Sequence, residues 1–501
     1  MMRCLFLRPI PPTILYETPC HHETVHQELL INGVFIGGPC DQSIGKTQHS
    51  SPYDGKLVGT AAEAGWSEFT AAIDAAETAF ESWQFSTPKT RADLLNRVAF
   101  LVRERFTELA ELMAEEIGKP ITQSEAEVTR LAITFELAAK LALQNHTREI
   151  DVSHDSCSKN VRVTATRVPV GPILAIVPYN WPLNLAAHKI APALAAGNTV
   201  VVKTPSMGTL CTLALGRIIH EAGCPDGVVN VLNTVPALAQ KAALDPRIKM
   251  LSFTGSPQVG WMLKELLPKK RVSLELGGDA TAVIAPDSDI DHAIEKLIPG
   301  AFAYAGQICI SLQHILCHET RYLEFREKFT RATESVQTGN PLDRTVTCGP
   351  MISSEAADNA IALIEDAENH GAKLLTGGHR IGNIIEPAVI ESPTRQMRIG
   401  IEEAFAPLVT IQSYSTDDQA INWINSSQFG IHAALFTQDQ ARIQTYFNNL
   451  ETGGLIINNS PSLRFDAMPY GGIKNSGFGR EGVANTFHEM TEDKVLVQTE
   501  N

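Results

Sequence analysis

Apolar residues recur at three- and four-residue spacing from residue 66 onward, which is typical of amphipathic helices. The run SEFTAAIDAAETAFESW predicts a first helix that ends near residue 83. Thr87-Pro88 opens a second helix, because proline at the first helical position lacks an N–H that would have no helical partner. We expect this helix to continue to Gly118 and a third helix to cover residues 123–144.

Residues 148–168 change to a two-residue alternation of apolar and polar side chains. The segments EIDVS and NVRVTATRV flank the polar stretch HDSCSK, which predicts a β-hairpin. A two-stranded hairpin is only marginally stable alone. It therefore needs a further surface to pack on, and a partner subunit is one candidate.

Apolar strands then alternate with helices. The predicted strands cover residues 173–178, 198–203, 227–232 and 249–255. Continuous apolar strands separated by helices indicate βαβ units and a parallel sheet that is covered on both faces. The pattern restarts near Glu275 with the segments SLEL and TAVIAP, a helix from Asp289 and the strand HILCHE. A second α/β domain is expected to begin there.

Composition excludes several classes of protein. At roughly 150 residues per domain, 501 residues correspond to about three domains. The 41 basic and 56 acidic side chains give a formal net charge of −15, which repels a phosphate backbone, so nucleic-acid binding is not expected. Hydrophobic residues make up 44% of the chain, yet no window is long and apolar enough to predict a membrane span.

The cysteines and the N-terminal sequence indicate the cellular compartment in which the protein is expected. Nine scattered cysteines without a C-x-x-C pair argue against a disulfide framework and against a metal site, and they suit a reducing cytoplasm. The start, MMRCLFLRPIPP, has too short an apolar stretch for a signal peptide. We expect residues 1–30 to be an N-terminal extension, either poorly ordered or extended.

Three residues could carry chemistry, and each has a structural alternative. Cys309, in YAGQICIS, follows a helical run whose end would favour the nucleophilic thiolate; a buried apolar cysteine is the alternative. Glu275 ends an apolar strand, where burial would raise the pKa of a general base, unless it forms a structural ion pair. Asn180, in PYNWP, could donate to a developing oxyanion or could cap the helix that starts near Pro182.

A glycine-containing turn indicates a phosphate site. The segment FTGS, with Gly255 and Ser256, closes a strand and opens a helix. Backbone N–H groups at a helix N-terminus bind phosphate well. The segment is not G-x-G-x-x-G, so it is a weak dinucleotide signal on its own.

The order of these motifs is more specific than any one of them. The chain carries, in sequence, Asn180, Lys203, FTGS (253–256), ELGG (275–278), GQIC (306–309), EAF (403–405) and PYGG (469–472). Together they resemble the aldehyde dehydrogenase superfamily. The resemblance runs from INGVFIGG at Ile31 to NSGFGREG and the tail.

The resemblance implies an α/β fold with three parts. A Rossmann-like cofactor domain would comprise residues 31–147 and 168–274, and an α/β catalytic domain residues 275–474. The hairpin (148–167) and the tail (475–501) would form a small β oligomerisation arm, which pairs with another subunit in a homodimer or a dimer of dimers.

The resemblance also implies a reaction, the NAD(P)-dependent oxidation of a small-molecule aldehyde to its carboxylic acid. Cys309 would attack the aldehyde carbon and form a thiohemiacetal, whose oxyanion is held by the Asn180 amide and the Cys309 backbone N–H. Hydride transfer to the nicotinamide would leave a thioester, which a water activated by Glu275 hydrolyses.

Eight residues are implied as cofactor contacts. Lys203 and Glu403 would hold ribose hydroxyls, Ser256 and its neighbours the pyrophosphate, and Phe405 the nicotinamide ribose. For Lys203 a strand-end lysine that reaches to solvent is the alternative. The complete set is Pro178, Tyr179, Lys203, Ser206, Gly255, Ser256, Glu403 and Phe405.

One position bears on the choice between NAD and NADP. Relatives that prefer NAD usually have a glutamate three residues after the lysine, where it repels a 2′-phosphate. This chain has Ser206 there. NADP is therefore expected to be accepted, with NAD as the other possibility.

The substrate is expected to be a small or medium aliphatic aldehyde. Relatives that oxidise phosphorylated aldehydes often have arginine directly before the nucleophile, where this chain has Ile308. Arg464, in PSLRFDAMPYGG, is the remaining candidate anchor for an anionic group. An ion pair between Arg464 and Asp466 is the alternative.

Two residues depart from the family pattern. Asp279 follows ELGG, and two carboxylates so close in sequence could raise the pKa of either Glu275 or Asp279. Ala406 replaces a glycine in EEAFAP, which would be awkward if that position needs a positive φ.

Two other functions remain open. A coenzyme A-acylating dehydrogenase would generally lack the glutamate at 275. A catalytically inactive homologue would not need the set Cys309, Glu275 and Asn180.

Overall fold

Five parallel strands form the centre of the larger sheet in the computed structural model, which describes residues 24–499. Antiparallel strands close both edges of this sheet. In spatial order its strands are β22 (Gly477–Phe478), β12 (Arg271–Glu275), β11 (Met250–Thr254), β8 (Ile173–Ile176), β9 (Val200–Lys203), β10 (Val229–Leu232), β2 (Leu29–Ile31) and β3 (Val34–Ile36). The central strands are almost wholly buried, as their continuous apolar sequence predicts.

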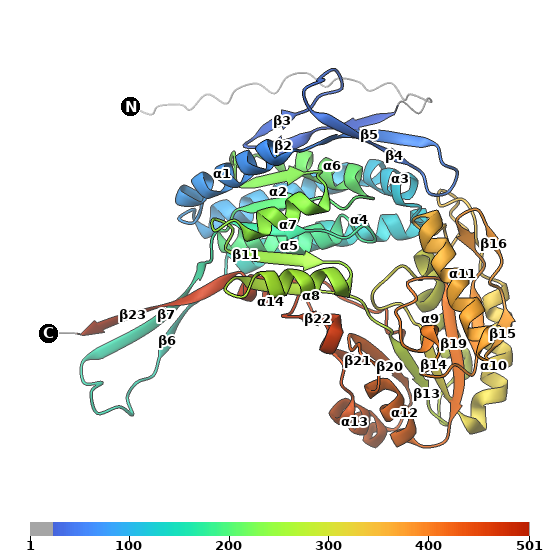
Figure 1. Cartoon of the computed structure of the whole chain (residues 1–501). Helices are drawn as coiled ribbons and strands as arrows, with labels where there is room; N and C mark the ends of the chain where they lie inside the picture. The colour runs from blue at the N-terminus through green and yellow to red at the C-terminus, as the bar shows by residue number, and fades with distance from the viewer. Residues whose placement is uncertain (1–23, 500–501) are drawn as a thin grey trace, which may run out of the picture.

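Helices cover both faces of this sheet (Figure 1). They are α1 (Trp66–Trp83), α2 (Pro88–Glu104), α3 (Phe106–Ile117), α4 (Ile121–Ala142), α5 (Asn184–Ala196), α6 (Thr209–Glu221), α7 (Pro236–Leu244) and α8 (Pro257–Leu266). The prediction of one helix from residue 88 to 118 was wrong. The helix breaks at Arg105, whose φ of −105° and ψ of 24° are not helical, and α3 turns to contact α4 and α6.

A second sheet forms the other lobe, and all its strands are parallel except β15. Its order is β15 (Lys373–Thr376), β18 (Ala388–Glu391), β19 (Leu408–Tyr414), β14 (His314–His318), β13 (Thr281–Ile284), β20 (His432–Phe436) and β21 (Gly454–Ile457). The helices of this lobe are α9 (Ile290–Phe302), α10 (Glu319–Glu334), α11 (Ser354–Asn369), α12 (Asp417–Asn425) and α13 (Gln440–Asn449). Short elements complete it: η1 (Ala303–Gly306), η2 (Arg398–Gly400), η3 (Lys474–Ser476) and the hairpin β16 (Arg380–Ile381) and β17 (Ile384–Ile385).

The chain crosses between the two sheets just after Glu275. The segment SLEL was expected to open the second domain, but it lies in β12 and pairs in parallel with β11 of the first sheet. The second sheet begins only with β13, six residues later in the chain than Glu275.

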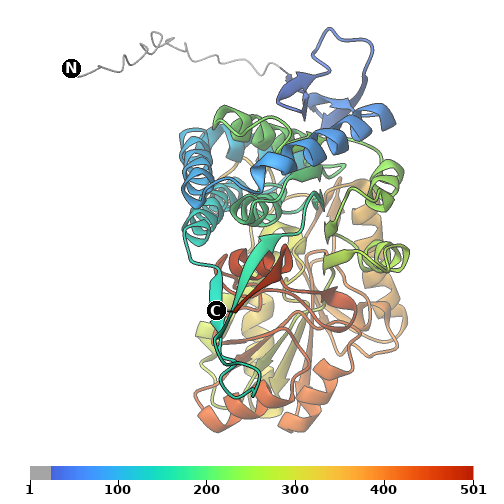
Figure 2. The same ribbon diagram turned by 90° about the vertical axis from the view of Figure 1, so that its left-hand side faces the viewer.

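The predicted hairpin is present and is extended by the end of the chain. Strands β6 (Thr147–Ile150) and β7 (Val161–Pro169) pair antiparallel, and β23 (Thr491–Thr499) pairs with β7 along its whole length. Helix α14 (Val483–Glu489) leads into β23. The three strands project away from both lobes as an arm (Figures 1 and 2).

Near its N-terminus the chain forms strands within the predicted extension. Strand β1 (Val25–Gln27) pairs with β5 (Leu57–Glu63), which also pairs with β4 (Gly45–Ser50), and β2 joins the larger sheet. Residues 1–23 of the predicted extension lie outside the described residues. Among residues 24–499, no helix is long and apolar enough to cross a membrane.

The strand order places a cleft at one edge of the larger sheet. Strands β9 and β10 lie on one side of β8, whereas β11 and β12 lie on the other, so the order reverses between β8 and β11. Ligands bind at such switch points, beyond the carboxyl ends of the strands. In the register Ile176 pairs with Lys203 and Thr254 with Glu275, so the predicted motifs meet at this edge.

Candidate active site

A cleft of about 780 Å³ opens at the carboxyl ends of β8, β9 and β11. All eight residues predicted as cofactor contacts line it, and so do Asn180 and Cys309. Residues that were not predicted complete the wall, among them Met207, Pro236, Gln240, Met262 and Leu263. Glu275 is buried and does not line the cleft.

Cys309 follows a left-handed turn. Tyr304, Ala305 and Gly306 have φ values of 51°, 52° and 68°, which redirects the chain after α9. Gln307 then anchors the turn, because its side-chain amide donates to the carbonyls of Tyr304 and Pro350 at 3.2 Å each. This places Cys309 at the cleft instead of in the apolar core, so the alternative of a buried structural cysteine does not hold.

Some of the groups around the Cys309 thiol raise its pKa and others lower it. Burial raises its pKa to about 12, and Glu403 and Glu275 act in the same direction. The Tyr470 hydroxyl, 2.7 Å from Sγ, and the Arg464 charge oppose this rise.

Asn180 does not cap a helix. Its Nδ2 donates to the Gln307 carbonyl at 2.9 Å, and helix α5 begins only at Asn184. The Glu127 carboxylate accepts from the backbone N–H groups of Leu183 and Asn184 at 2.9 Å each, so it takes the capping role. An amide nitrogen carries two N–H groups, and one bond to Gln307 leaves the second for a ligand in the cleft.

Glu275 carries a buried carboxylate that forms no ion pair with any described residue. It is 4% exposed, and within residues 24–499 neither carboxylate oxygen has a hydrogen-bond partner. Burial raises the pKa of Glu275 well above its usual value, and the nearby Glu481 charge raises it further. The predicted alternative of a structural ion pair is therefore wrong, and a raised pKa suits a general base.

The absence of a side chain at Gly471 leaves space for the Glu275 carboxylate. Gly471 has a φ of +146°, and a Cβ there would lie 2.9 Å from Glu275 Oε1. The second glycine-rich motif, PYGG, thus borders Glu275 directly.

Arg464 forms an ion pair with Glu481 instead of the expected pair with Asp466. Its guanidinium donates to Glu481 at 2.8 Å and is only 7% exposed. Asp466 instead pairs with Arg130 at 2.7 Å and contacts His188 at 2.9 Å. The predicted pair of Arg464 with Asp466 is wrong.

Two charged residues in the cleft fit a dinucleotide. Lys203 ends β9, has no ion pair among the described residues, and burial lowers the pKa of its ammonium to about 8. Glu403 accepts from the Gly278 N–H at 2.9 Å, and burial raises its pKa to about 8. A buried lysine without a partner and a carboxylate acceptor suit a ligand that carries ribose hydroxyls, which both donate and accept.

The part of the cleft next to α8 is suited to bind the phosphates of a dinucleotide. Ser256 is the N-cap of α8 and accepts from the Val259 N–H at 3.4 Å. Because Gly255, Ser256 and Val259 all line the cleft, the N-terminus of a ten-residue helix faces it. Such a helix end favours an anion.

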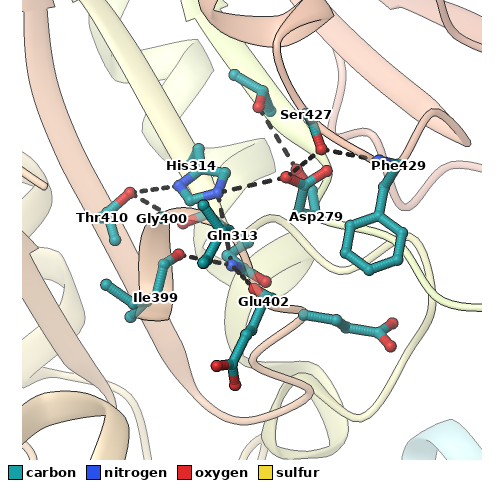
Figure 3. A network of polar contacts seen from close by, with 12 residues as sticks. Asp279, Gln313, His314, Ile399, Gly400, Glu402, Thr410, Ser427 and Phe429 are labelled. Carbon is teal, nitrogen blue, oxygen red and sulfur yellow. Dashed lines mark hydrogen bonds and ion pairs between the residues drawn. The ribbon is translucent and has the colours of Figure 1, made fainter. Parts of the chain in front are cut away.

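A polar network holds the segment that carries Glu403 and Phe405 (Figure 3). The Gln313 amide donates to the carbonyls of Ile399 and Glu402 at 3.0 and 2.8 Å and accepts from the Ala404 N–H at 2.9 Å. The positive φ of this segment falls on Phe405 (46°), not on Ala406. The glycine replaced by Ala406 is therefore not needed for a left-handed conformation here.

Asp279 belongs to the same network and not to the surroundings of Glu275. Ser427 donates to its carboxylate at 2.6 Å, and His314 Nε2 lies 3.8 Å from it (Figure 3). The Arg395 guanidinium lies 3.4 Å from the same carboxylate. Its charge raises the pKa of Glu403 instead. The expected effect of Asp279 on Glu275 is not seen.

Sequence reasoning missed four supporting residues. Gln307 and Gln313 anchor the segments next to Cys309 and Glu403, and Lys119 and Glu127 anchor the segment from Asn180 to Asn184. Only Gln307 had a signal, since it lies within the GQIC motif, two residues before Cys309. The other three lie far from the residues that they hold in sequence.

Comparison with known proteins bears out the family resemblance. Residues 40–496 match the model of the aldehyde dehydrogenase family. The 3-sulfolactaldehyde dehydrogenase of Priestia megaterium is 35% identical over 466 residues, which is 93% of this chain and 97% of that protein. The structure is similar to aldehyde dehydrogenase 21 of Physcomitrella patens in complex with the reaction product succinate, with a TM-score of 0.92, 35% identity, and coverage of 95% of this chain and 99% of that one.

A second solved structure is similar as well. It is the glyceraldehyde-3-phosphate dehydrogenase GapN of Methanocaldococcus jannaschii complexed with NADP, with a TM-score of 0.87, 35% identity, and coverage of 91% of this chain and 99% of that one. These matches confirm the expected α/β fold and the expected enzyme class. The chain belongs to the aldehyde dehydrogenase family.

Proposed function

We propose that this enzyme oxidises a small aliphatic aldehyde to the carboxylic acid through a covalent intermediate on Cys309. The observation that carries the proposal is the meeting of Cys309 and Asn180 with the eight predicted cofactor contacts in one cleft. Cys309 attacks the aldehyde carbon as thiolate, and the second N–H of Asn180 and the Cys309 backbone N–H hold the oxyanion of the thiohemiacetal. NAD or NADP in the cleft would supply the hydride acceptor.

Glu275 releases the acid. As a buried carboxylate without a hydrogen-bond partner in the described part of the chain, it is free to take a proton from a water molecule. That water attacks the thioester carbon, the C–S bond breaks, and Cys309 leaves as thiolate. Since coenzyme A-acylating relatives generally lack this glutamate, hydrolysis is favoured over acyl transfer to coenzyme A.

Two variants test the covalent route. Cys309→Ala should abolish formation of the reduced cofactor, whereas Cys317→Ala, at a buried cysteine in β14, should leave it unchanged. Glu275→Gln should release about one equivalent of reduced cofactor in the first turnover and then stop, because the thioester is not hydrolysed. Unchanged turnover of Cys309→Ala would indicate a catalytically inactive cysteine, and an acyl-coenzyme A product would indicate the acylating reaction.

NADP is the favoured cofactor. Ser206 is exposed in the cleft and brings no negative charge to the position where a glutamate would repel a 2′-phosphate. An aldehyde panel assayed with NAD and with NADP tests this preference. A kcat/KM for NAD about tenfold higher than for NADP would contradict it.

A small aldehyde is the favoured substrate. Two of the similar proteins are named for 3-sulfolactaldehyde and for a complex with succinate, and the third is named for glyceraldehyde-3-phosphate; all three are short-chain compounds. Arg464 is already paired with Glu481, and Ile308 offers no charge, so an anionic group on the substrate is not required. Turnover of only long-chain or aromatic aldehydes would contradict this choice.

The arm is proposed to join subunits in a homodimer or a dimer of dimers. Strand β23 forms the edge of the arm sheet, and it exposes Val495, Leu496 and Val497 at 58, 56 and 60%. An exposed apolar edge strand is a template for pairing with another chain. Removal of residues 491–501 should give monomers in sedimentation experiments, and an unchanged oligomer would contradict the role of the arm.

A reducing compartment such as the cytoplasm is proposed for the enzyme, because an oxidised Cys309 could not attack an aldehyde.

The proposed domain limits are those expected from the sequence. The cofactor domain comprises residues 31–147 and 168–274, the catalytic domain residues 275–474, and the arm residues 148–167 and 475–501.

A further inference from the structure

The hydroxyl of Tyr470 is the polar group that contacts the sulfur of Cys309. The two atoms lie 2.7 Å apart, and Tyr470 is only 2% exposed. In the thiol state either atom could donate the hydrogen bond. Once the sulfur has lost its proton, only the phenol can donate.

Several contacts fix the direction of this hydroxyl. The backbone of Tyr470 pairs with Glu481, with N–O distances of 2.9 and 2.7 Å. One face of the ring lies against the Arg464 guanidinium, whose Cζ is 3.7 Å from the ring centroid. The His432 ring meets Tyr470 edge-on at 5.4 Å. The hydroxyl is thus held toward Sγ by groups that are themselves buried.

We infer that Tyr470 is a catalytic residue of this enzyme, whose hydroxyl donates a hydrogen bond to the Cys309 thiolate and so maintains the nucleophile before the aldehyde arrives. The inference rests on the proposed role of Cys309. Hydrogen bonds to an ionised acceptor are roughly twice as strong as those between neutral groups. A thiol is a weak donor, so this hydrogen bond stabilises the thiolate more than the thiol and opposes the rise in the pKa of Cys309.

The charges around the sulfur explain why this donor matters. Glu275 from β12 and Glu403 from the segment after η2 both disfavour a second negative charge at Cys309, and burial does the same. Only Arg464 and the Tyr470 hydroxyl act in the opposite direction among the groups that shift the pKa of Cys309 most. Because Arg464 is already paired with Glu481, the hydroxyl is the group whose bond is made to the sulfur itself.

Tyr470 remains a donor over the whole working range of pH. Burial and the nearby Cys309 and Glu275 raise the pKa of its phenol well above the ordinary value. The phenol therefore keeps its proton and does not act as the base that removes the thiol proton.

Alkylation of Cys309 by iodoacetamide tests the inference without any aldehyde or cofactor. The thiolate attacks the CH2 carbon, an S–C bond forms, iodide leaves, and the thiol proton is released to the buffer. The full-length protein is alkylated between about pH 5 and pH 10, and the rate at Cys309 is followed by peptide mass. The Cys309→Ala protein identifies the signal from the other cysteines.

Tyr470→Phe keeps the ring and removes only the hydroxyl. We expect the rising limb of its alkylation profile to be displaced by about one pH unit to higher pH relative to the wild-type protein, because the charge-assisted bond is lost. At pH 7 this corresponds to a rate about tenfold lower. Tyr446→Phe is the matched control, since it removes a buried hydroxyl that donates to Asp417 at 3.0 Å, and its profile should coincide with the wild type.

Coincident profiles of Tyr470→Phe and the wild-type protein would overturn the inference. That outcome is separate from failure of the proposed function, which is decided by aldehyde oxidation in the wild-type and Cys309→Ala proteins. If Cys309→Ala still oxidised aldehydes, the proposed function would fail whatever the alkylation profile of Tyr470→Phe.

Discussion

Lys119 and Glu127 form an ion pair in which neither side chain has any solvent exposure, with 2.5 Å between Nζ and Oε2. Lys119 also donates to the Asn180 carbonyl at 3.1 Å, and Glu127 accepts from the first N–H groups of α5. One ion pair thus holds both ends of the segment that carries Asn180, which lines the same cleft as Cys309. The Lys119 ammonium also lies 3.5 Å above the Trp181 ring within that segment.

Neutralising one member of this pair should destabilise the protein strongly. In Glu127→Gln the side-chain oxygen can still accept from the N–H groups of α5, but the Lys119 charge loses its partner. Breaking a buried pair in this way costs about 3–5 kcal/mol. We expect a clear fall in the thermal unfolding midpoint.

The double variant Lys119→Met/Glu127→Gln should lose less stability than the sum of the two single variants, since neither charge is left unpaired. Asp93→Asn is the matched control. It removes an exposed i,i+4 pair with Lys89, whose contribution should be within about 0.5 kcal/mol. Strictly additive losses would show that the two charges do not depend on each other.

Gln313 should control cofactor affinity from a distance. Gln313→Ala removes all three hydrogen bonds that hold Ile399, Glu402 and Ala404, so the segment with Glu403 and Phe405 is no longer fixed (Figure 3). We expect the Kd for NADPH, measured by fluorescence, to rise about tenfold, in line with the loss of one to two net hydrogen bonds.

The control for Gln313 is Gln419→Ala, at an exposed glutamine that accepts from Ser415 near the start of α12. Its NADPH affinity should equal that of the wild type. An unchanged Kd in Gln313→Ala would mean that other contacts hold the segment.

The sequence predicted correctly those features that depend on residues close together in the chain. The βαβ alternation defines its own strands, and the positions of Asn180, Lys203 and Glu275 at strand ends follow directly from it. The strand that ends at Glu275 was assigned to the wrong sheet, because an apolar strand carries no information about its neighbour. That information lies in the pairing with β11.

The supporting residues could not be predicted, for a related reason. Lys119 and Glu127 are buried charges: Glu127 lies in α4, where a helix pattern places charges on the solvent side, and Lys119 lies in the short connection between α3 and α4. Their burial is explained by the segment from Asn180 to Asn184, to which both side chains bond and which begins 61 residues after Lys119 in the chain. The Arg464 pair likewise depends on Glu481, which the tertiary fold brings to it in place of the nearer Asp466.

Ser206 should decide between the two nicotinamide cofactors. Ser206→Glu places a carboxylate in the cleft, where it repels the 2′-phosphate of NADP. Two like charges near 4 Å cost between about 1 kcal/mol in water and 4 kcal/mol near a protein surface, so kcat/KM for NADP should fall about tenfold or more. The value for NAD should fall less or rise.

Ser206→Ala separates the two effects of the substitution. It removes the hydroxyl without adding a charge, so its kcat/KM for NADP should fall by less than that of Ser206→Glu. Equal losses with NADP in both variants would attribute the preference to the hydroxyl alone.

Glu481 should set the acid limb of the pH–rate profile through Glu275. Burial and the Glu481 charge raise the pKa of Glu275, and a base must be deprotonated, so turnover limited by thioester hydrolysis is lost as pH falls through that raised pKa. Glu481→Gln removes the negative neighbour and leaves the positive Arg464 and Lys189 uncompensated. Both changes lower the pKa of Glu275. The loss of kcat should therefore begin at a lower pH than in the wild type, which steady-state assays across the acid range measure.

Glu492→Gln, at an exposed carboxylate paired with Arg271 beside the arm, should leave the limb in place. A limb that moved to higher pH in Glu481→Gln would show that the Glu481 charge does not raise the pKa of the base.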